Sequence, residues 1–349
     1  MPLTDRRNGP KPANVGALLV GLGLLLSEPA QADACAPPSG LAPCFDANSL
    51  WLPAGPAAFM TLPDTRVNDP GKINLGFTSE LLRGPVRAHV TSPDSGGRDV
   101  RVVDYALDAS LFFTIGAFKD FQLSLTLPTR VYQNGAGADG VASQSAPPIA
   151  QQALRDPRLG VAYSLDDVLA RPGVGLRLAA DVSVPLGNQA VFAGERSLVL
   201  QPSVTFGWQL TPFALRASFG ARVREAVEFG DVRLGNQGLF AFGAGIDALA
   251  PGLLFFSLEA LALPPLASNR ASTANSALSG VTLFPAEWLF AVHSSLRPSS
   301  QWSLSIAAGT GLPLSSETRH SSTGSSTVYF LAVTEPEWRA LIAVRFAPR

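Results

Sequence analysis

The sequence predicts an all-β fold, a closed antiparallel transmembrane β-barrel of about twelve up-and-down strands with both termini periplasmic. Three observations predict it. Apolar and polar residues alternate with a period of two in many segments. After the N-terminal region, no segment has the roughly 18 uninterrupted apolar residues of a membrane helix. The connections between the alternating segments are long and short in turn, which is typical of outer-membrane barrels.

The first 32 residues have the three parts of a secretory signal peptide. These are a basic start, a short apolar run and a small-x-small cleavage signal: Arg6, Arg7 and Lys11, then 15–26, then Ala30-Gln31-Ala32. An uncleaved membrane anchor is the alternative, but the apolar run is shorter than the roughly 20 residues of a span. A lipid-modified Cys35 is a second alternative. We therefore expect residues 1–32 to be removed on export.

Composition limits the remaining chain. The formal net charge is −1, which gives no reason to expect a nucleic-acid partner. Cys35 and Cys44 are the only cysteines and could form a disulfide in an oxidising compartment. The Pro-rich residues 33–72 precede the first alternating segment, and we expect them to form a periplasmic arm or a plug. Residues 73–349 are expected to form the barrel.

Alternation defines the candidate strands. In residues 121–127, phenylalanine and leucine occupy one face, and glutamine, serine and threonine occupy the other. Most candidates have 9–14 residues, enough for a tilted crossing of a bilayer, which takes about 9–11 residues. The predicted strands are 73–82, 102–115, 119–128, 157–165, 173–186, 197–210, 212–224, 238–249, 253–263, 286–297, 301–312 and 337–346.

The connections sort by length. Short turns fall near 116–118, 166–172, 211, 250–252 and 298–300, and longer loops fall at 83–101, 129–156, 187–196, 225–237, 264–285 and 313–336. Outer-membrane barrels have short periplasmic turns and long outer loops. An even number of strands then begins and ends in the periplasm.

Charged residues fall on the faces opposite the apolar ones, where a transmembrane barrel has its interior. The lumen-lining candidates are Arg177, Asp181, Arg216, Arg222, Asp247, Glu259, His293, Arg297 and Arg345. Further charged candidates include Glu80, Asp108, Arg158, Glu287 and Arg339. Because both signs are present in similar numbers, two interpretations stay open. The charges form structural ion pairs across the lumen, or they tune the selectivity of a pore.

Large aromatic residues recur near the strand ends on the apolar faces. Rings that are part apolar and part polar settle at the headgroup level of a membrane. We expect an aromatic girdle of Phe121, Trp208, Phe213, Trp288, Trp302, Trp338 and Phe346. The alternative is that these rings are ordinary core residues.

Enzyme and metal motifs are weak. His293 is followed by Ser294 and Ser295, but a hydrolase of this kind needs a nucleophile, a base and an orienting group within reach of one another. His293 is expected to face the lumen instead. No spacing of metal ligands is recognisable, so the sequence predicts no enzyme, no metal and no cofactor.

Three segments resemble strands of a known set of Gram-negative outer-membrane barrels. They are Asp156-Pro-Arg-Leu-Gly-Val-Ala-Tyr-Ser-Leu165, Asp181-Val-Ser-Val-Pro-Leu-Gly187 and Trp338-Arg-Ala-Leu-Ile-Ala-Val-Arg-Phe346. The set includes the MetA-type barrels associated with phenol-degradation gene clusters and the N-terminal barrels of OmpA-family proteins. The resemblance implies an outer-membrane channel or transport role. The last strand, which ends in Phe346 and is followed by 347–349, also resembles the signal read by the barrel-assembly machinery.

These features predict a cell outer-membrane protein in contact with lipid and with the barrel-assembly machinery. Its predicted function is that of a porin-like channel for passive passage of small solutes. Two alternatives stay open: a structural or adhesin-like barrel with a closed lumen and functional outer loops, and a soluble secreted β-protein.

Overall fold

The computed structural model describes residues 42–55, 57–90, 97–142, 148–169, 171–229, 232–249, 253–266, 285–295, 301–312 and 328–347. Residues 1–32, which are the predicted signal peptide, lie outside this part, as do residues 33–41. Twelve long strands form one wall: β1 (Ile73–Val90), β2 (Arg98–Phe118), β3 (Phe121–Asn134), β5 (Arg158–Ser164), β6 (Val174–Ser183), β7 (Val199–Leu210), β8 (Phe213–Arg222), β11 (Gln237–Asp247), β12 (Leu254–Ala262), β13 (Ala286–Ser295), β14 (Trp302–Gly311) and β16 (Trp338–Phe346). Each overlaps one predicted strand.

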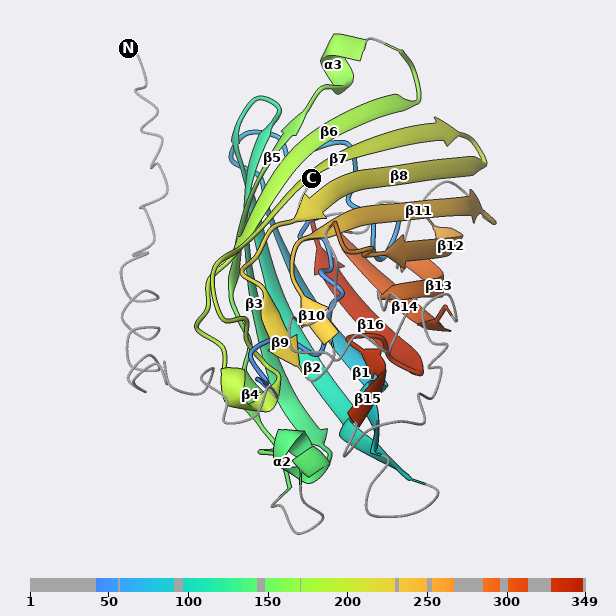
Figure 1. The fold of residues 1–349 in the computed structure, drawn as a ribbon. Helices are drawn as coiled ribbons and strands as arrows, with labels where there is room; N and C mark the ends of the chain where they lie inside the picture. Colours follow the sequence, from blue (N-terminus) through green and yellow to red (C-terminus); the bar gives the residue numbers. More distant parts are fainter. Residues whose placement is uncertain are drawn as a thin grey trace, which may run out of the picture. The chain divides into compact units, whose positions relative to one another are not determined.

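The wall closes on itself. Strands that follow one another along it pair antiparallel, and β1 pairs with β2 on one side and with β16 on the other (Figure 1). Glu80 of β1, for example, lies opposite both Asp108 of β2 and Leu341 of β16. A closed sheet leaves no edge of unpaired N–H and C=O groups, which is the condition for crossing a bilayer with strands. The predicted closed antiparallel barrel is confirmed.

The outer surface of the wall is apolar. Along β5, exposed and buried residues alternate strictly. The exposed residues are Leu159, Val161 and Tyr163, whereas the charged Arg158 is only 7% exposed. A soluble protein has the opposite arrangement, because water favours charged residues outside and apolar residues inside. The apolar exterior therefore fits lipid. Among the described residues, no helix has the length and hydropathy to cross a membrane.

β1 and β2 extend beyond the predicted strands. The sequence places a loop at 83–101, but β1 continues to Val90 and β2 begins at Arg98. The pairing between them shifts register after Arg83, and Gly84 there has a φ of +56°. A β-bulge explains this, because it accommodates a left-handed glycine and a neighbouring proline such as Pro85 without ending the strand. The predicted loop was wrong over most of its length.

Small elements occupy the other connections. At the end with long loops they are α2 (Gly137–Ala142), β4 (Ala153–Leu154), η3 (Gln189–Val191), β9 (Val227–Phe229), β10 (Val232–Leu234) and β15 (Val328–Val333). At the opposite end, only residues 119–120 separate β2 from β3 and residues 211–212 separate β7 from β8, while α3 (Asp166–Leu169) lies between β5 and β6. We call these the long-loop end and the short-turn end.

Residues 42–72, which we call the inner segment, pass through the interior of the barrel. Near one end of the segment, the N–H of Ala42 donates to the carbonyl oxygen of Glu228 in β9, at the long-loop end. Near its other end, the N–H of Gly71 donates to the carbonyl oxygen of Gly116, beside the short turn. β1 begins and β16 ends at the short-turn end, as predicted, but residue 42 lies at the long-loop end. A plug was one of the two alternatives for residues 33–72, but the sequence did not indicate that this part of the chain reaches the long-loop end.

Candidate functional site

Arginines of the wall hold the backbone of the inner segment. Arg216 of β8 donates from Nη1 to the carbonyl oxygen of Pro63 (2.8 Å) and from Nη2 to Oδ1 of Asp64 (3.0 Å). Further contacts of this kind are Arg222 Nη2 to Ser49 O (3.0 Å), Arg177 Nη1 to Asp64 O (3.0 Å) and Arg345 Nη1 to Ala57 O (3.1 Å). Guanidinium groups suit this role because they carry five donors and remain charged. The inner segment is therefore fixed by side chains from several strands.

Glu259 of β12 is the acidic counterpart of these arginines. Its carboxylate accepts from the N–H groups of Met60 (2.8 Å) and Thr61 (2.6 Å), and from the hydroxyls of Thr61 (2.6 Å) and Ser257 (2.8 Å). His293 Nε2 lies 4.0 Å from the same carboxylate. The two carboxylate oxygens of Glu259 thus hold residues 60–61 of the inner segment.

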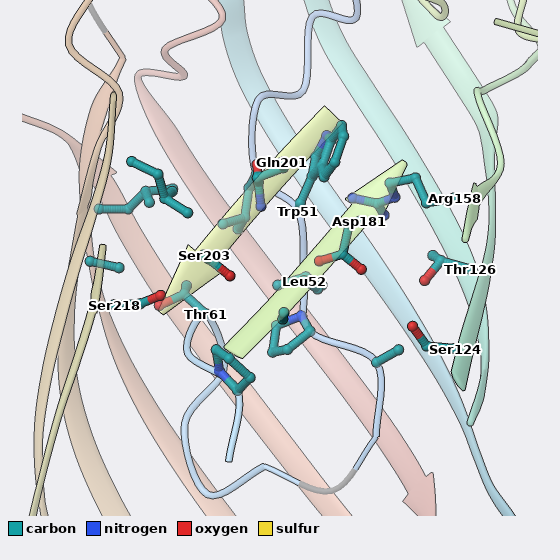
Figure 2. Close-up of a pocket in the computed structure, with 18 of the residues that line it drawn as sticks. Trp51, Leu52, Thr61, Ser124, Thr126, Arg158, Asp181, Gln201, Ser203 and Ser218 are labelled. Atoms are coloured by element: carbon teal, nitrogen blue, oxygen red, sulfur yellow. The ribbon is translucent and has the colours of Figure 1, made fainter. Parts of the chain in front are cut away.

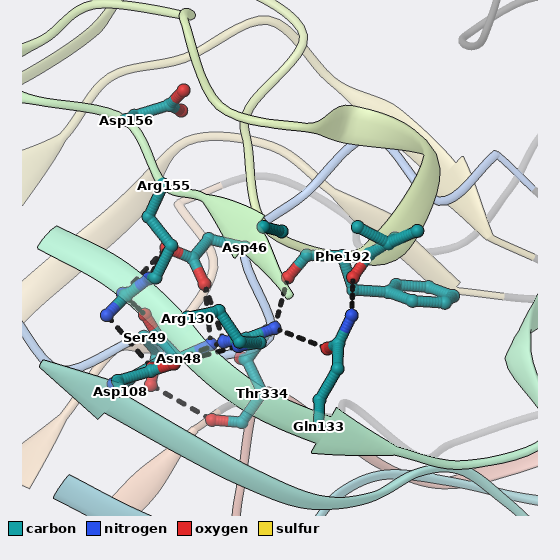
Figure 3. A network of polar contacts seen from close by, with 12 residues as sticks. Asp46, Asn48, Ser49, Asp108, Arg130, Gln133, Arg155, Asp156, Phe192 and Thr334 are labelled. Carbon is teal, nitrogen blue, oxygen red and sulfur yellow. Dashed lines mark hydrogen bonds and ion pairs between the residues drawn. The ribbon is translucent and has the colours of Figure 1, made fainter. Parts of the chain in front are cut away.

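A buried ionic cluster surrounds Asn48 at the long-loop side of the interior (Figure 3). The Asn48 amide nitrogen donates to Asp108 Oδ2 (2.9 Å) and to Glu80, and its oxygen accepts from Arg339 Nη1 (2.8 Å). We call this group the Asn48 cluster; its members are Asp46, Asn48, Glu80, Asp108, Arg130, Arg155, Glu287 and Arg339.

The arginines of the Asn48 cluster are fully paired. Arg339 makes a two-pronged contact with Glu287, at 2.8 Å from Nε and 2.9 Å from Nη2. Arg130 donates to Asp108 from Nε (2.8 Å) and to the carbonyl oxygen of Phe192 from Nη1 (2.8 Å). Removing one partner of such a buried pair leaves an uncompensated charge and costs about 3–5 kcal/mol. The cluster therefore fixes residues 46–48 more firmly than a single contact could.

Glycines on the inward faces of the wall make room for the inner segment. A Cβ at Gly207 of β7 would lie 2.8 Å from Cγ2 of Thr65, and a Cβ at Gly243 of β11 would lie 2.8 Å from Leu62 and from Phe59. All three distances are shorter than real Cβ atoms tolerate. The absence of a side chain at these positions thus permits the close approach of the inner segment.

Within the described part of the chain, cavities lie at both ends of the barrel and in its interior. One of about 590 Å³ is at the long-loop end, between Arg87, Arg101 and Glu337. One of about 450 Å³ is at the short-turn end, where Asp247, His293 and Arg345 face it. A small cavity of about 70 Å³ lies between the inner segment and β3, β5, β6, β7 and β8 (Figure 2). The inner segment lines both the small cavity and the cavity at the short-turn end.

The structure brings most of the predicted lumen residues to the interior. Six are buried there: Arg177, Arg216, Arg222, Glu259, His293 and Arg345. Asp181 and Asp247 are half-buried and line cavities. Arg297 lies outside the described residues. Arg130 and Arg155 were missed because the sequence assigned them to a loop at 129–156, whereas Arg130 belongs to β3.

The predicted girdle residues lie on the outer face. Trp208, Phe213, Trp288, Trp302 and Trp338 are exposed, and Phe121 and Phe346 are half-exposed. The rings of Trp302 and Phe346 lie 4.8 Å apart, both at the short-turn end. The Nε1 of Trp288 donates to Oγ1 of Thr310. Their position at headgroup depth stays a prediction.

Cys44 is disulfide-bonded, and the chain's other cysteine, Cys35, lies outside the described residues. Within the described ranges, no group of three or more His, Cys, Asp or Glu side chains is arranged to hold a metal ion. His293 contacts Ser305 at Nδ1 (2.8 Å) and Ser257 at Nε2 (3.3 Å).

Asp156 fixes the loop between β6 and β7 at the long-loop end. Its carboxylate accepts from the N–H groups of Gly187 and Glu195, each at 2.6 Å. Burial raises the pKa of Asp156 to about 7, and the nearby Asp46 and Glu195 carboxylates add to this rise, while the two N–H donors oppose it. This carboxyl group therefore titrates near neutral pH.

A closed wall with an apolar outside and a charged inside decides the class of protein. This is an outer-membrane β-barrel. The fold is similar to that of the COG4313 outer membrane channel from Pseudomonas putida F1, with a TM-score of 0.55 and 11% identity over 82% of this chain and 98% of the other.

Two further solved structures are more distant. The NanC porin has a TM-score of 0.46 and 9% identity, over 78% of this chain and 98% of the other. The toluene transporter TodX of P. putida has a TM-score of 0.40 and 10% identity, over 80% and 91%. No family model matches the sequence, and no curated protein matches it. The resemblance to MetA-type and OmpA-family barrels therefore stays a prediction.

Proposed function

We propose that the protein is an outer-membrane channel for small solutes, which the inner segment closes in the state described and which opens when this segment moves. One observation carries the proposal. From residue 48 to 68, the described inner segment makes no backbone–backbone hydrogen bond to the wall. Its contacts with the wall in this stretch run through side chains, so the segment can move without breaking a strand pair.

Energetics favours motion of the segment over motion of the wall. A hydrogen bond between a charged side chain of the wall and the inner segment contributes about 1.5–3 kcal/mol to stability when it is exchanged for one with water. An unpaired backbone group facing lipid costs several kcal/mol. The wall is therefore the rigid part and the inner segment the displaceable part. The likeness of fold to an outer-membrane channel supports the channel part of the proposal.

A reversible crosslink tests the proposal. Because a Cβ at Gly207 would lie close to Thr65, the double variant Thr65→Cys with Gly207→Cys should tie the inner segment to β7. Conductance is measured in planar bilayers for the parent, the oxidised variant and the reduced variant. We expect openings in the parent, none in the oxidised variant and recovery after reduction. The parent treated with the same reductant controls for the Cys44 disulfide.

Two results would overturn the proposal. If the oxidised variant conducts as the parent does, solutes do not need the segment to move. If no form conducts, the barrel is not a channel. The second result would favour a structural or adhesin-like barrel, which the extensive anchoring of the inner segment would also suit.

A further inference from the structure

The small cavity between the inner segment and the wall differs from the Asn48 cluster in its charge balance. Arg158, Arg177 and Arg222 line it, and the one carboxylate among its lining residues is Asp181. In the described part of the chain, none of these three arginines forms an ion pair. In the Asn48 cluster, by contrast, every arginine contacts a carboxylate. The cavity therefore holds a surplus of buried positive charge.

Two guanidinium nitrogens at the cavity are buried and without a partner. They are Nη1 of Arg158 and Nε of Arg177, and both residues are 7% exposed. An unpaired buried donor costs about 1–3 kcal/mol, and more when it is charged. Three buried guanidinium groups face one carboxylate, that of Asp181, so the described lining residues do not supply enough negative charge to balance them.

Trp51 keeps the arginines together at the cavity. The guanidinium carbons of Arg158 and Arg222 lie 5.0 Å and 4.5 Å from its ring centroid. Contact with an aromatic face stabilises a cation and so offsets the repulsion between two like charges. Figure 2 shows Trp51 and Arg158 side by side, with Asp181 next to them. Trp51 belongs to the inner segment, so this cavity exists only while that segment is in place.

Neutral polar groups complete the lining. Hydroxyl-bearing side chains reach the cavity from β3, β7 and β8: Ser124, Thr126, Ser203 and Ser218. A volume of about 70 Å³ exceeds the roughly 10–15 Å³ that one water molecule requires. A molecule of a few non-hydrogen atoms with negative charge and several acceptor oxygens fits both the size and the donors.

We propose that this cavity binds a small oxyanion, a carboxylate or a phosphate, held by Arg158, Arg177 and Arg222 against Trp51. Oxyanions accept charge-assisted hydrogen bonds from guanidinium groups, and these are about twice as strong as neutral ones. The bound anion neutralises the surplus charge and links the inner segment to the wall. The proposal does not depend on conduction, because binding is measured on the closed protein.

Thermal unfolding of the full chain in detergent tests the site. Sodium acetate, sodium phosphate and sodium chloride are titrated at equal ionic strength and fixed pH, with the unfolding midpoint as readout. Phosphate stabilises many proteins through exclusion from their surface. The decisive quantity is therefore the difference between the parent and Arg158→Gln, a variant chosen because Arg158 donates no hydrogen bond to the described inner segment.

We expect acetate, phosphate or both to raise the midpoint of the parent more than chloride does. The apparent dissociation constant should rise roughly tenfold in Arg158→Gln, because one charge-assisted contact is lost. It should fall in Asp181→Asn, which removes the competing carboxylate. Acetate acting alone assigns a carboxylate site, and phosphate acting alone assigns a phosphate site. Equal responses of the parent and both variants, or a parent response no larger than that to chloride, would refute the proposal.

Discussion

Glu259 is the side chain whose two oxygens hold the middle of the inner segment. The change Glu259→Gln replaces one acceptor oxygen by a donor, so an N–H of Met60 or Thr61 loses its partner. We expect this change to lower the free energy of local opening of residues 60–61 by about 1–3 kcal/mol. Hydrogen exchange of the peptide that contains residues 58–63, followed by mass spectrometry, should show faster exchange.

The control for this prediction is Glu225→Gln, in which the altered side chain is exposed and, among the described residues, forms an ion pair with Arg196 alone. It should leave the exchange of residues 58–63 unchanged. Equal exchange rates in Glu259→Gln and the parent would show that other contacts hold this part of the segment.

The raised pKa of Asp156 predicts a pH dependence of stability. An acid that binds its proton more tightly in the folded state stabilises that state fully below its unfolded pKa of 3.8, and this contribution is lost as the pH rises towards about 7. Between pH 5 and pH 8 we expect the free energy of unfolding to fall by about 1–3 kcal/mol through this group.

Asp156→Asn isolates that contribution, because an amide does not titrate. The variant loses one acceptor for Gly187 or Glu195, so its stability is lower at every pH, but its slope between pH 5 and pH 8 should be shallower than that of the parent. Denaturant unfolding in detergent at the two pH values measures both slopes. Parallel slopes would contradict the prediction.

At the scale of elements, β11 needs a glycine at position 243 in order to pack against the inner segment. In Gly243→Val, the new side chain would overlap Leu62 and Phe59 of the inner segment. Overpacking of this kind costs about 1–3 kcal/mol. The midpoint of the heat-induced shift in gel mobility should fall. Ala244→Val adds the same kind of bulk on the lipid-facing side of β11 and should leave the midpoint almost unchanged; equal shifts would contradict the packing argument.

The sequence predicted which segments form the strands of the wall better than it predicted where each strand begins and ends. Period-two alternation located all twelve strands, because each has one face in lipid and one in a charged interior. The pattern failed at Gly84 and Pro85, which ordinarily end a strand. Here a β-bulge absorbs them, and a bulge depends on pairing with β2 and not on local preference.

On the scale of the whole molecule, the apolar exterior makes a quantitative prediction. Leu258 lies at the middle of β12 and is 56% exposed. An arginine at the bilayer midplane costs about 2–4 kcal/mol, falling to about 0–1 kcal/mol near the interface. Leu258→Arg should therefore lower the free energy of unfolding in lipid vesicles by about 2–4 kcal/mol.

Leu249 provides the matched control, since it is equally exposed but lies in the turn between β11 and β12. Leu249→Arg should cost little. If the two variants were equally stable, the surface around Leu258 would not lie in hydrocarbon.

The candidate site could be predicted only in part. Strand periodicity assigned Arg177, Arg216 and Glu259 to the interior, because one face of each strand is charged. It could not show what they bind, since residues 42–72 have no repeating pattern. Asp64 and Arg216, for instance, are 152 positions apart in the chain. Such a contact forms only when the barrel has closed, so local sequence patterns do not predict it. The inward glycines were the available clue, because they leave space that something must fill.

The path of the inner segment also constrains the order of assembly. It precedes β1 in the chain, yet it reaches the far mouth of a ring that is sealed where β1 meets β16. Once β1 has paired with β16, residues 42–47 could reach the long-loop end only by threading through the lumen of the closed barrel. Threading is not needed if the inner segment binds to the sheet before the barrel closes. The pairing of β1 with β16 then closes the barrel around a segment that is already bound.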